Sequence, residues 1–153
     1  MNDGAEIFFL DTNVLLYTRD KRDRSKQQRA VAWTTGTWDT GAGRVSWQVL
    51  HEYYWNGTRK LKIDPMIVRA DVHDLAQFNP VQASLALVQR AWHWCDQAQL
   101  AYWDALIVAA AEHCGATYLL SEDFEPKRRF GDCTVLDPFR SDPADYIRPI
   151  PPA

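Results

Sequence analysis

Two short apolar segments constrain the fold more than any other feature of the sequence, because each runs directly into acidic residues. Ile7–Leu10 ends at Asp11, and Thr117–Leu120 ends at the polar segment 121–123. Apolar runs of this length are typical of β-strands that are covered on both faces, as in a parallel sheet. In open α/β sheets, ligands bind in the crevice outside the carboxyl ends of the strands. If the two strands are parallel neighbours, we therefore expect Asp11 and Asp123 to face the same crevice.

Helix-like segments alternate with strand-like segments along the chain, which indicates an α/β fold with a mostly parallel central sheet. Arg44–Trp47 and Thr134–Leu136 are candidates for further strands. The predicted helices follow capping residues or a proline, or show apolar residues at helical spacing. They lie at Val14–Tyr17, about Arg24–Thr35, around Val49–Tyr54, Pro65–Leu75, Ser84–Gln99 and Tyr102–Cys114. The last helix is apolar on nearly every side, so we expect it to be central and buried.

The length of 153 residues suits one domain with its own core, and no repeat or linker divides the chain. We expect a single domain over residues 1–153, with its core at about 7–136. The proline-rich C-terminal tail at 137–153 is expected to be irregular.

Signals for membranes or secretion are missing from the sequence. No apolar run reaches the roughly 18 to 20 residues of a membrane span. No basic segment precedes the first apolar stretch, as a secretory signal would require. The three cysteines are widely spaced and odd in number, which fits reduced thiols better than a disulfide framework. These features predict a cytoplasmic protein without membrane contact.

Two further acidic residues lie on predicted helices. Asp104 stands near the start of the most apolar helix, where a carboxylate also interacts favourably with the helix dipole. Glu52 lies beside the apolar stripe of an earlier helix, where a surface position would explain it equally well. If both converge with Asp11 and Asp123, their repulsion raises their pKa values unless a cation lies among them.

The simplest occupant of such a group is a hard divalent cation with oxygen ligands, Mg²⁺ or Mn²⁺. The four histidines and three cysteines do not have the spacing of a zinc site. The sequence also contains no Gly-rich phosphate-binding loop.

The net charge of −3 excludes binding of nucleic acid by bulk positive charge alone. Basic residues nevertheless gather at 19–29, 59–62 and 127–129. Each group alone is an ordinary solvated surface. Around an acidic pocket the same groups would hold a polyanion against the repulsion of the carboxylates.

Four motifs together resemble the signatures of the PIN-domain nucleases in order and spacing. They are FLDTNVLLY at 9–17, VLHEYY at 49–54, YWDALIVAAA at 102–111 and LLSED at 119–123. The likeness spans about residues 7 to 136. Within that family, the short single-domain form resembles VapC, the toxin half of a bacterial toxin–antitoxin pair.

The resemblance implies a three-layer α/β/α fold and a metal-dependent endoribonuclease that hydrolyses RNA phosphodiester bonds. Asp11, Glu52, Asp104 and Asp123 match the family's metal-ligating acids, although Glu122 is an alternative for the fourth. Asn13 matches a supporting polar position, and Thr12 or Ser121 would supply a hydroxyl. Because water would be the nucleophile, the products would carry a 5′-phosphate and a 3′-hydroxyl.

The resemblance also implies partners: an RNA substrate, a cognate antitoxin and a second copy in a homodimer. We expect the antitoxin to insert an Arg into the acidic pocket, since a guanidinium binds carboxylates bidentately. Aromatic side chains would stack on unpaired bases, line a groove for a partner helix, or pack in the core or dimer interface. These are Trp47, Tyr53, Tyr54, Trp55 and Trp103.

Other classes of protein fit the sequence less well. A phosphatase of the haloacid-dehalogenase type also begins with a strand ending in Asp, but it needs a second Asp where this chain has Asn13. A response-regulator receiver domain carries its acidic residues in a different order. On the PIN fold itself, two alternatives to a toxin stay open: a housekeeping RNA-processing nuclease and a catalytically inactive module that binds RNA or protein.

Overall fold

The computed structural model describes residues 5–148 and has a five-stranded sheet in this range, with strand order β2-β1-β3-β5-β4. β1 pairs in parallel with β2 and β3, and β3 pairs in parallel with β5, whereas β4 is antiparallel to β5. The expected mostly parallel sheet is therefore confirmed. The strands are β1 (Phe8–Leu10), β2 (Gly43–Arg44), β3 (Tyr118–Leu120), β4 (Arg129–Phe130) and β5 (Cys133–Leu136).

The helices largely follow the capping signals in the sequence. Side chains of Asp11, Asp23, Ser46, Asp64 and Ser84 each accept a hydrogen bond from a backbone N–H at the start of a helix. The helices are α1 (Thr12–Tyr17), α2 (Arg24–Asp39), α3 (Trp47–Arg59), α4 (Pro65–Leu75), α5 (Leu85–Ala98), α6 (Tyr102–His113) and the 3₁₀ helix η1 (Pro143–Asp145).

Two predicted boundaries were wrong. The second helix continues to Asp39 instead of ending near Thr35. The strand expected at Arg44–Trp47 is confined to Gly43–Arg44, because Ser46 already caps α3.

The strand β4 was not predicted. It forms a short hairpin with β5 through Gly131, whose φ of 60° lies in the left-handed region. Arg129 and Phe130 are too few to show a pattern of alternating apolar residues, and Arg129 is charged. The strand is therefore recognisable only from its pairing with β5.

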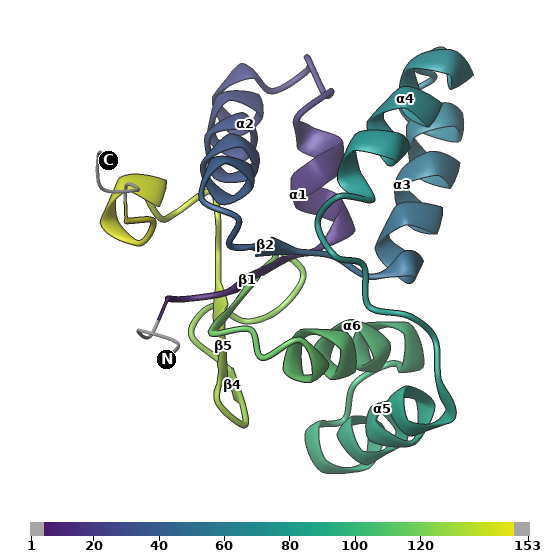
Figure 1. Cartoon of the computed structure of the whole chain (residues 1–153), viewed down its shortest axis with the longest axis vertical. Coiled ribbons are helices and arrows are strands. Elements are labelled where there is room, and N and C mark those ends of the chain that lie inside the picture. The colour runs from purple at the N-terminus through teal and green to yellow at the C-terminus, as the bar shows by residue number, and fades with distance from the viewer. Residues whose placement is uncertain (1–4, 149–153) are drawn as a thin grey trace.

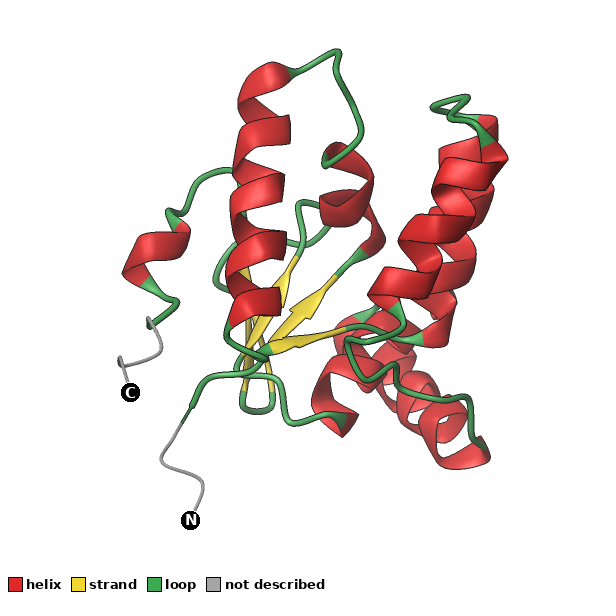
Figure 2. Cartoon of the chain, turned by 45° about the horizontal axis from the view of Figure 1, so that its top comes forward, coloured by secondary structure: helices red, strands yellow, loops and turns green. Residues whose placement is uncertain are grey.

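The helices surround the sheet in layers. Figure 1 shows α1 and α2 on one side of the strands and α5 with α6 on the other, and α3 and α4 form a second packed pair beside β2. Figure 2 shows the same short strands enclosed between helices. This arrangement confirms the expected three-layer α/β/α fold.

The core explains why β1 and α6 are so apolar. All three residues of β1 are buried, as expected for a central strand with helices on both faces. On α6 the run Ile107–Ala111 is buried throughout, and its alanines allow the helix to approach the sheet closely. No helix within residues 5–148 has the length and apolar character needed to cross a membrane.

The segment that follows β5 packs against α2 as far as Ile147. The indole N–H of Trp33 donates to the carbonyl of Pro138 at 2.8 Å, and the ring of Tyr146 lies 5.9 Å from that of Trp33. A Cβ at Gly36 would lie 2.8 Å from Ile147 Cδ1, so a larger residue there would displace the end of the Ile147 side chain. The first part of the tail that was expected to be irregular therefore packs against α2. Residues 149–153 lie outside the described range.

Candidate active site

Asp11 is the buried centre of the candidate site, with only 5% of its surface exposed. It follows β1 directly, and Oδ1 caps α1 by accepting a hydrogen bond of 2.7 Å from the Thr12 N–H. Oδ2 accepts from the Ser121 hydroxyl at 2.8 Å. Because β1 and β3 are parallel neighbours, the ends of both strands meet here, as the sequence predicted.

Asn13 connects the two strand ends. Its amide Nδ2 donates to Asp123 Oδ2 at 2.9 Å and lies 3.2 Å from the Ser121 hydroxyl oxygen. The Asp123 N–H in turn donates to the Ser121 hydroxyl at 3.1 Å. Asn13 and Ser121 therefore fix the positions of both Asp11 and Asp123.

Glu52 reaches the same region from α3. Its Oε2 accepts from the Thr12 hydroxyl at 3.0 Å, and its Oε1 accepts from the Gln48 amide at 2.7 Å. Gln48 also donates to the carbonyl of Trp103 at 3.1 Å, which ties α3 to the start of α6. Sequence reasoning missed Gln48, although its position one helical turn before Glu52 is a usable signal.

Asp104 lies in the first turn of α6 and is exposed to solvent. Neighbouring protein atoms still desolvate its carboxyl group in part, which raises its pKa, and the carboxylates of Asp123 and Glu52 raise the pKa further. The candidate site therefore has a buried floor at Asp11 and acidic residues at its open side.

Burial and charge act together on Asp11. The pKa of Asp11 is raised to about 7, chiefly by burial and to a smaller extent by the carboxylates of Asp123 and Glu52. Hydrogen bonds from Ser121 and Thr12 act in the opposite direction. The two hydrogen bonds therefore stabilise the negative charge of Asp11 only in part, and burial and the neighbouring carboxylates outweigh them.

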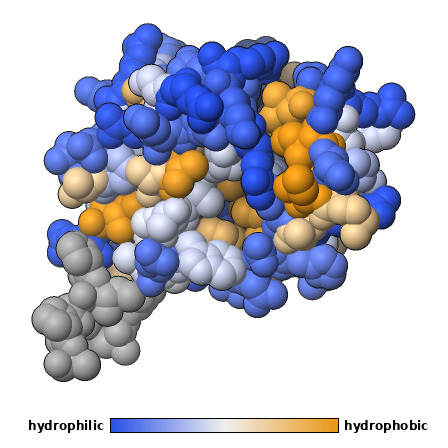
Figure 3. Space-filling model, turned by 90° about the horizontal axis from the view of Figure 1, so that it is seen from above, coloured by the Kyte–Doolittle hydropathy of each residue, from blue (hydrophilic) through white to orange (hydrophobic). Residues whose placement is uncertain are grey.

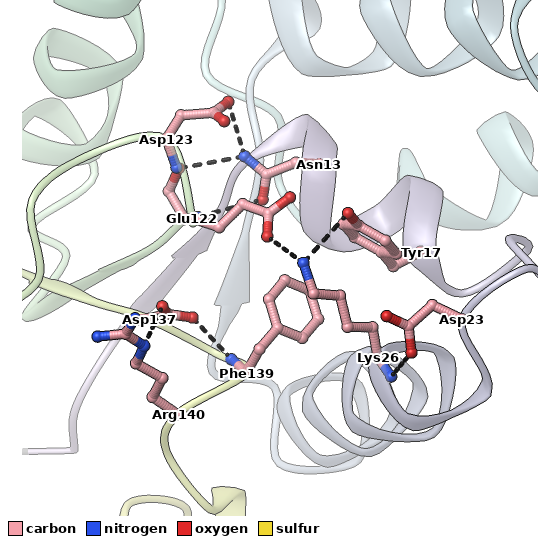
Figure 4. Close-up of polar contacts among 10 residues, drawn as sticks. Asn13, Tyr17, Asp23, Lys26, Glu122, Asp123, Asp137, Phe139 and Arg140 are labelled. Carbon is pink, nitrogen blue, oxygen red and sulfur yellow. Dashed lines mark hydrogen bonds and ion pairs between the residues drawn. The ribbon is translucent and has the colours of Figure 1, made fainter.

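The two neighbouring acids after β3 point to different partners (Figure 4). Asp123 contacts Asn13, whereas Glu122 Oε2 forms an ion pair of 2.8 Å with Lys26 of α2. This hydrogen bond raises the pKa of Lys26, so its ammonium stays charged. The geometry favours Asp123 over Glu122 as the fourth acid.

A model of the PIN domain family matches residues 8–129 of the sequence. The chain belongs to the PIN domain family. The matched range begins at β1 and includes Asp11, Glu52, Asp104 and Asp123.

A solved structure with a similar fold is the crystal structure of Mycobacterium tuberculosis VapC20, which is described as a toxin that cleaves the sarcin–ricin loop. The TM-score is 0.58 at 16% sequence identity, and the match covers 76% of this chain and 91% of VapC20. At this identity the likeness demonstrates a shared fold. A search of curated proteins gives no match to the sequence.

The donor atoms of this PIN site suit a hard cation. Carboxylate and hydroxyl oxygens lie around Asp11, and the Asn13 amide presents its N–H group to them. The contacts described above include no histidine or cysteine side chain. Within residues 5–148, no three His, Cys, Asp or Glu side chains form a ready-made group for a metal ion. Mg²⁺ commonly binds one or two protein carboxylates and keeps several waters. The residues therefore fit an ion held by few direct ligands and do not fit a closed cage such as structural zinc requires.

The basic segment 19–29 is largely engaged in ion pairs within the PIN domain. Four of its cations pair with acidic side chains of the chain itself: Arg19 with Asp71, Arg22 with Asp20, Lys26 with Glu122 and Arg29 with Asp142. The exposed residues Lys127 and Arg129 lie between Asp123 and the end of β4. Lys127 follows Asp123 by four residues and is the better candidate for contact with a polyanion at the site. Arg129 pairs with Thr134, beside the start of β3 and away from its carboxyl end.

Proposed function

We propose that this PIN domain is a metal-dependent endoribonuclease that hydrolyses RNA phosphodiester bonds, and that it is the toxin of a toxin–antitoxin pair. The observation that carries the proposal is the buried Asp11 carboxylate, whose pKa is raised to about 7 at the meeting point of β1 and β3. The carboxylates of Asp123 and Glu52 act on Asp11, and the same two carboxylates act on Asp104. A site with several interacting carboxylates gains most from binding a cation.

In this proposal Asp11, Glu52, Asp104 and Asp123 hold Mg²⁺ or Mn²⁺. A bound ion of this kind activates a water molecule and neutralises charge on the phosphate. The chain's own residues prepare the site for it, because hydrogen bonds fix the carboxylates before any ligand arrives. Ser121 and Asn13 orient Asp11 and Asp123, and Thr12 with Gln48 orients Glu52.

The open side of the site suits a polymer. Asp104 and Asp123 are exposed, so a phosphodiester within a longer chain can approach them without entering a closed cavity. Lys127 would contact the backbone of single-stranded or loop RNA beside the scissile phosphate.

Cleavage of a labelled single-stranded RNA tests the enzymatic part of the proposal. The purified protein should cut in Mg²⁺ or Mn²⁺ and stop in EDTA, leaving a 5′-phosphate and a 3′-hydroxyl. Asp123→Asn should lose cleavage, whereas the matched control Glu125→Gln, an exposed acid two residues further along the same loop, should retain it. Full activity in EDTA, or in folded Asp123→Asn, would contradict the assignment.

The fold shared with VapC20 supports the assignment as a toxin, and an apolar groove supports the expected antitoxin. The groove has a volume of about 970 Å³ between α3, α5 and α6, and Trp47, Trp55 and Trp103 line it together with Glu52. An amphipathic antitoxin helix would cover the tryptophans, and an Arg on it would reach Glu52 and the neighbouring acids.

Co-expression with the product of the adjacent gene tests this pairing. Binding should inhibit cleavage. Trp55→Ala should weaken the complex because it removes apolar contact in the groove. The triple variant Asp11→Asn, Glu52→Gln and Asp104→Asn should weaken it by removing the attraction between the acidic residues and the partner's Arg. If the triple variant binds equally well and the partner's basic residues lie far from the site, the inhibition mechanism is wrong. If strong expression without a partner is tolerated, the protein is a housekeeping nuclease.

We also propose that the protein is cytoplasmic and forms a homodimer through α5. Leu85 and Trp92 are 68% and 52% exposed and lie two helical turns apart on one side of this helix. Figure 3 looks down on the molecule of Figure 1 from the side opposite α5, and on that face separate apolar areas lie among hydrophilic surface. In a dimer with a two-fold axis the same surface of both copies meets, so the apolar side of α5 would pack against the apolar side of α5 in the second copy.

Light scattering tests the dimer. The wild-type mass should be twice that of the 17.6 kDa chain, and Trp92→Glu should reduce it to one chain. A wild-type monomer at micromolar concentration would rule out the dimer.

A further inference from the structure

Lys26 does not point into solvent like a typical member of a basic segment. Its ammonium group donates to Glu122 Oε2 at 2.8 Å and to the Tyr17 hydroxyl at 3.4 Å. Figure 4 shows these three side chains converging from α1, α2 and the loop after β3. The contact joins residues that are 96 positions apart in the sequence.

The C-terminal segment completes the surroundings of Lys26. The rings of Tyr17 and Phe139 pack edge to face at 4.9 Å, and the Lys26 ammonium lies 4.8 Å and 5.0 Å from their centres. A cation at this distance from two aromatic rings is attracted by both. The hydrogen bond from Trp33 to the carbonyl of Pro138 holds the segment beside Phe139 in place.

Glu122 transmits this contact to the candidate active site. It is the residue before Asp123, and its own N–H lies 3.5 Å from Asn13 Oδ1. The loop 121–123 is therefore fixed on one side by Asn13 and Ser121 and on the other by Lys26. Pairing with Lys26 also keeps the charge of Glu122 directed away from the carboxylate of Asp123 (Figure 4).

We propose that Lys26, held between Tyr17 and Phe139, is a positioning residue that orients the Glu122–Asp123 loop for cation binding, and that the C-terminal segment is thereby a working part of the active site. The inference rests on the proposed function. Phe139 lies beyond residues 8–129, the range that the family model matches. Supporting residues of this kind typically change metal affinity or activity by about 10- to 100-fold.

A matched pair of variants on α2 tests the proposal. Lys26→Met removes the ammonium and keeps the apolar stem. Arg29→Met, three residues along the same helix, removes the same charge and breaks a pair with Asp142 of the C-terminal segment. Both variants change the net charge equally. They differ in that Lys26→Met loses the contacts with Glu122, Tyr17 and Phe139, whereas Arg29→Met loses contacts with Ser141 and Asp142.

The first measurement is Mn²⁺ binding by calorimetry on the full chain. Lys26→Met should raise the Mn²⁺ Kd about tenfold or more, whereas Arg29→Met should leave it near the wild-type value. Lys26→Arg should restore most of the affinity, because it restores the charge beside Glu122. Phe139→Leu should weaken binding in the same direction as Lys26→Met, since it keeps apolar volume and removes one ring.

The second measurement is amide hydrogen exchange at residues 121–123 in the metal-free protein. Exchange should be faster in Lys26→Met than in Arg29→Met, because only the first loses a tie to the loop. Equal exchange and equal Mn²⁺ affinity in the two variants would overturn the proposal. If the wild type binds Mn²⁺ but cleaves no RNA, the proposed function fails, while the difference between the two variants still decides the role of Lys26.

Discussion

Asp11 is the residue at which burial and charge conflict most directly. Its carboxyl group keeps its proton in the folded state up to about pH 7, but in the unfolded chain only up to about 3.8. Between these values the folded state binds more protons, so the free energy of unfolding falls as the pH rises, by about 1.4 kcal/mol per pH unit. The destabilisation of the folded state by the Asp11 charge is fully present above pH 7 and absent below pH 3.8.

We therefore predict that Asp11→Asn changes the pH dependence of stability in metal-free protein. In urea unfolding with EDTA, the variant should gain stability relative to the wild type as the pH rises from 5 to 8. The amide also loses part of the hydrogen bonding to Thr12 and Ser121, which lowers its stability equally at every pH. Parallel profiles for the two proteins would show that Asp11 does not titrate in this range.

Asp104 allows a cleaner separation of charge from structure, because its side chain is exposed. Asp104→Asn keeps the shape and loses the interaction with the helix dipole, which costs at most about 1 kcal/mol. The loss is offset because the raised pKa shows that the folded protein disfavours the charge of Asp104. It should reduce RNA cleavage on the order of 100-fold or more, since a neutral amide binds a cation poorly. In a toxin it should also relieve growth arrest.

Thermal unfolding and cleavage rates measured together check this prediction. A folded Asp104→Asn protein that cuts RNA at the wild-type rate would remove Asp104 from the site. Loss of the fold would instead show that its main role is to stabilise the start of α6.

At the scale of elements, helix caps connect stability with the site. Ser46 is buried and caps α3, the helix that carries Glu52, by accepting from the Val49 N–H at 3.3 Å. Ser84 caps α5 in the same way through Leu87 at 3.1 Å, and α5 carries none of the four acids. Each cap contributes about 1 kcal/mol.

We predict that Ser46→Ala and Ser84→Ala destabilise the protein by similar amounts but differ at the site. Ser46→Ala should also weaken Mn²⁺ binding, because fraying of α3 begins one and a half turns before Glu52. Chemical unfolding and calorimetry on both variants provide the comparison. An equal effect of the two variants on Mn²⁺ affinity would mean that α3 is held by its packing and not by its cap.

The whole molecule carries a net charge of −3 and acts on a polyanion in the proposed function. Its affinity for RNA must then come from local basic residues, and it should fall as salt increases. We predict that Lys127→Gln reduces the slope of log K against log[salt] by about 0.7, the value for one contact to a single strand. Lys21→Gln, with the same loss of charge in the segment 19–29, should leave the slope unchanged.

Binding of a fluorescent RNA to the inactive Asp104→Asn protein at several salt concentrations measures both slopes. A larger effect of Lys21→Gln would place the RNA along α1 and α2 and would reverse the orientation proposed for the substrate.

The sequence by itself determined the fold class and the order of the acidic motifs, because these signals are local. An apolar run between helices reads as a buried strand, and Ser, Asp or Pro marks the start of a helix within a few residues. Asp11 was recognisable in this way, since it both ends β1 and caps α1. The alternation of strand-like and helix-like segments also predicted the parallel sheet. In the structure β1 and β3 are parallel neighbours, which brings the loops that carry Asp11 and Asp123 together.

Only the tertiary structure decided which partner each side chain takes. Lys26 looked like one of several exposed cations, and Glu122 was an open alternative to Asp123 as the fourth acid. β4 and the C-terminal segment showed no regular pattern of their own. All of these depend on contacts between distant positions, such as Lys26 with Glu122 and Trp33 with Pro138. Propensity and periodicity describe the neighbours along the chain, whereas ion pairs and packing are formed by the neighbours that folding brings together in space.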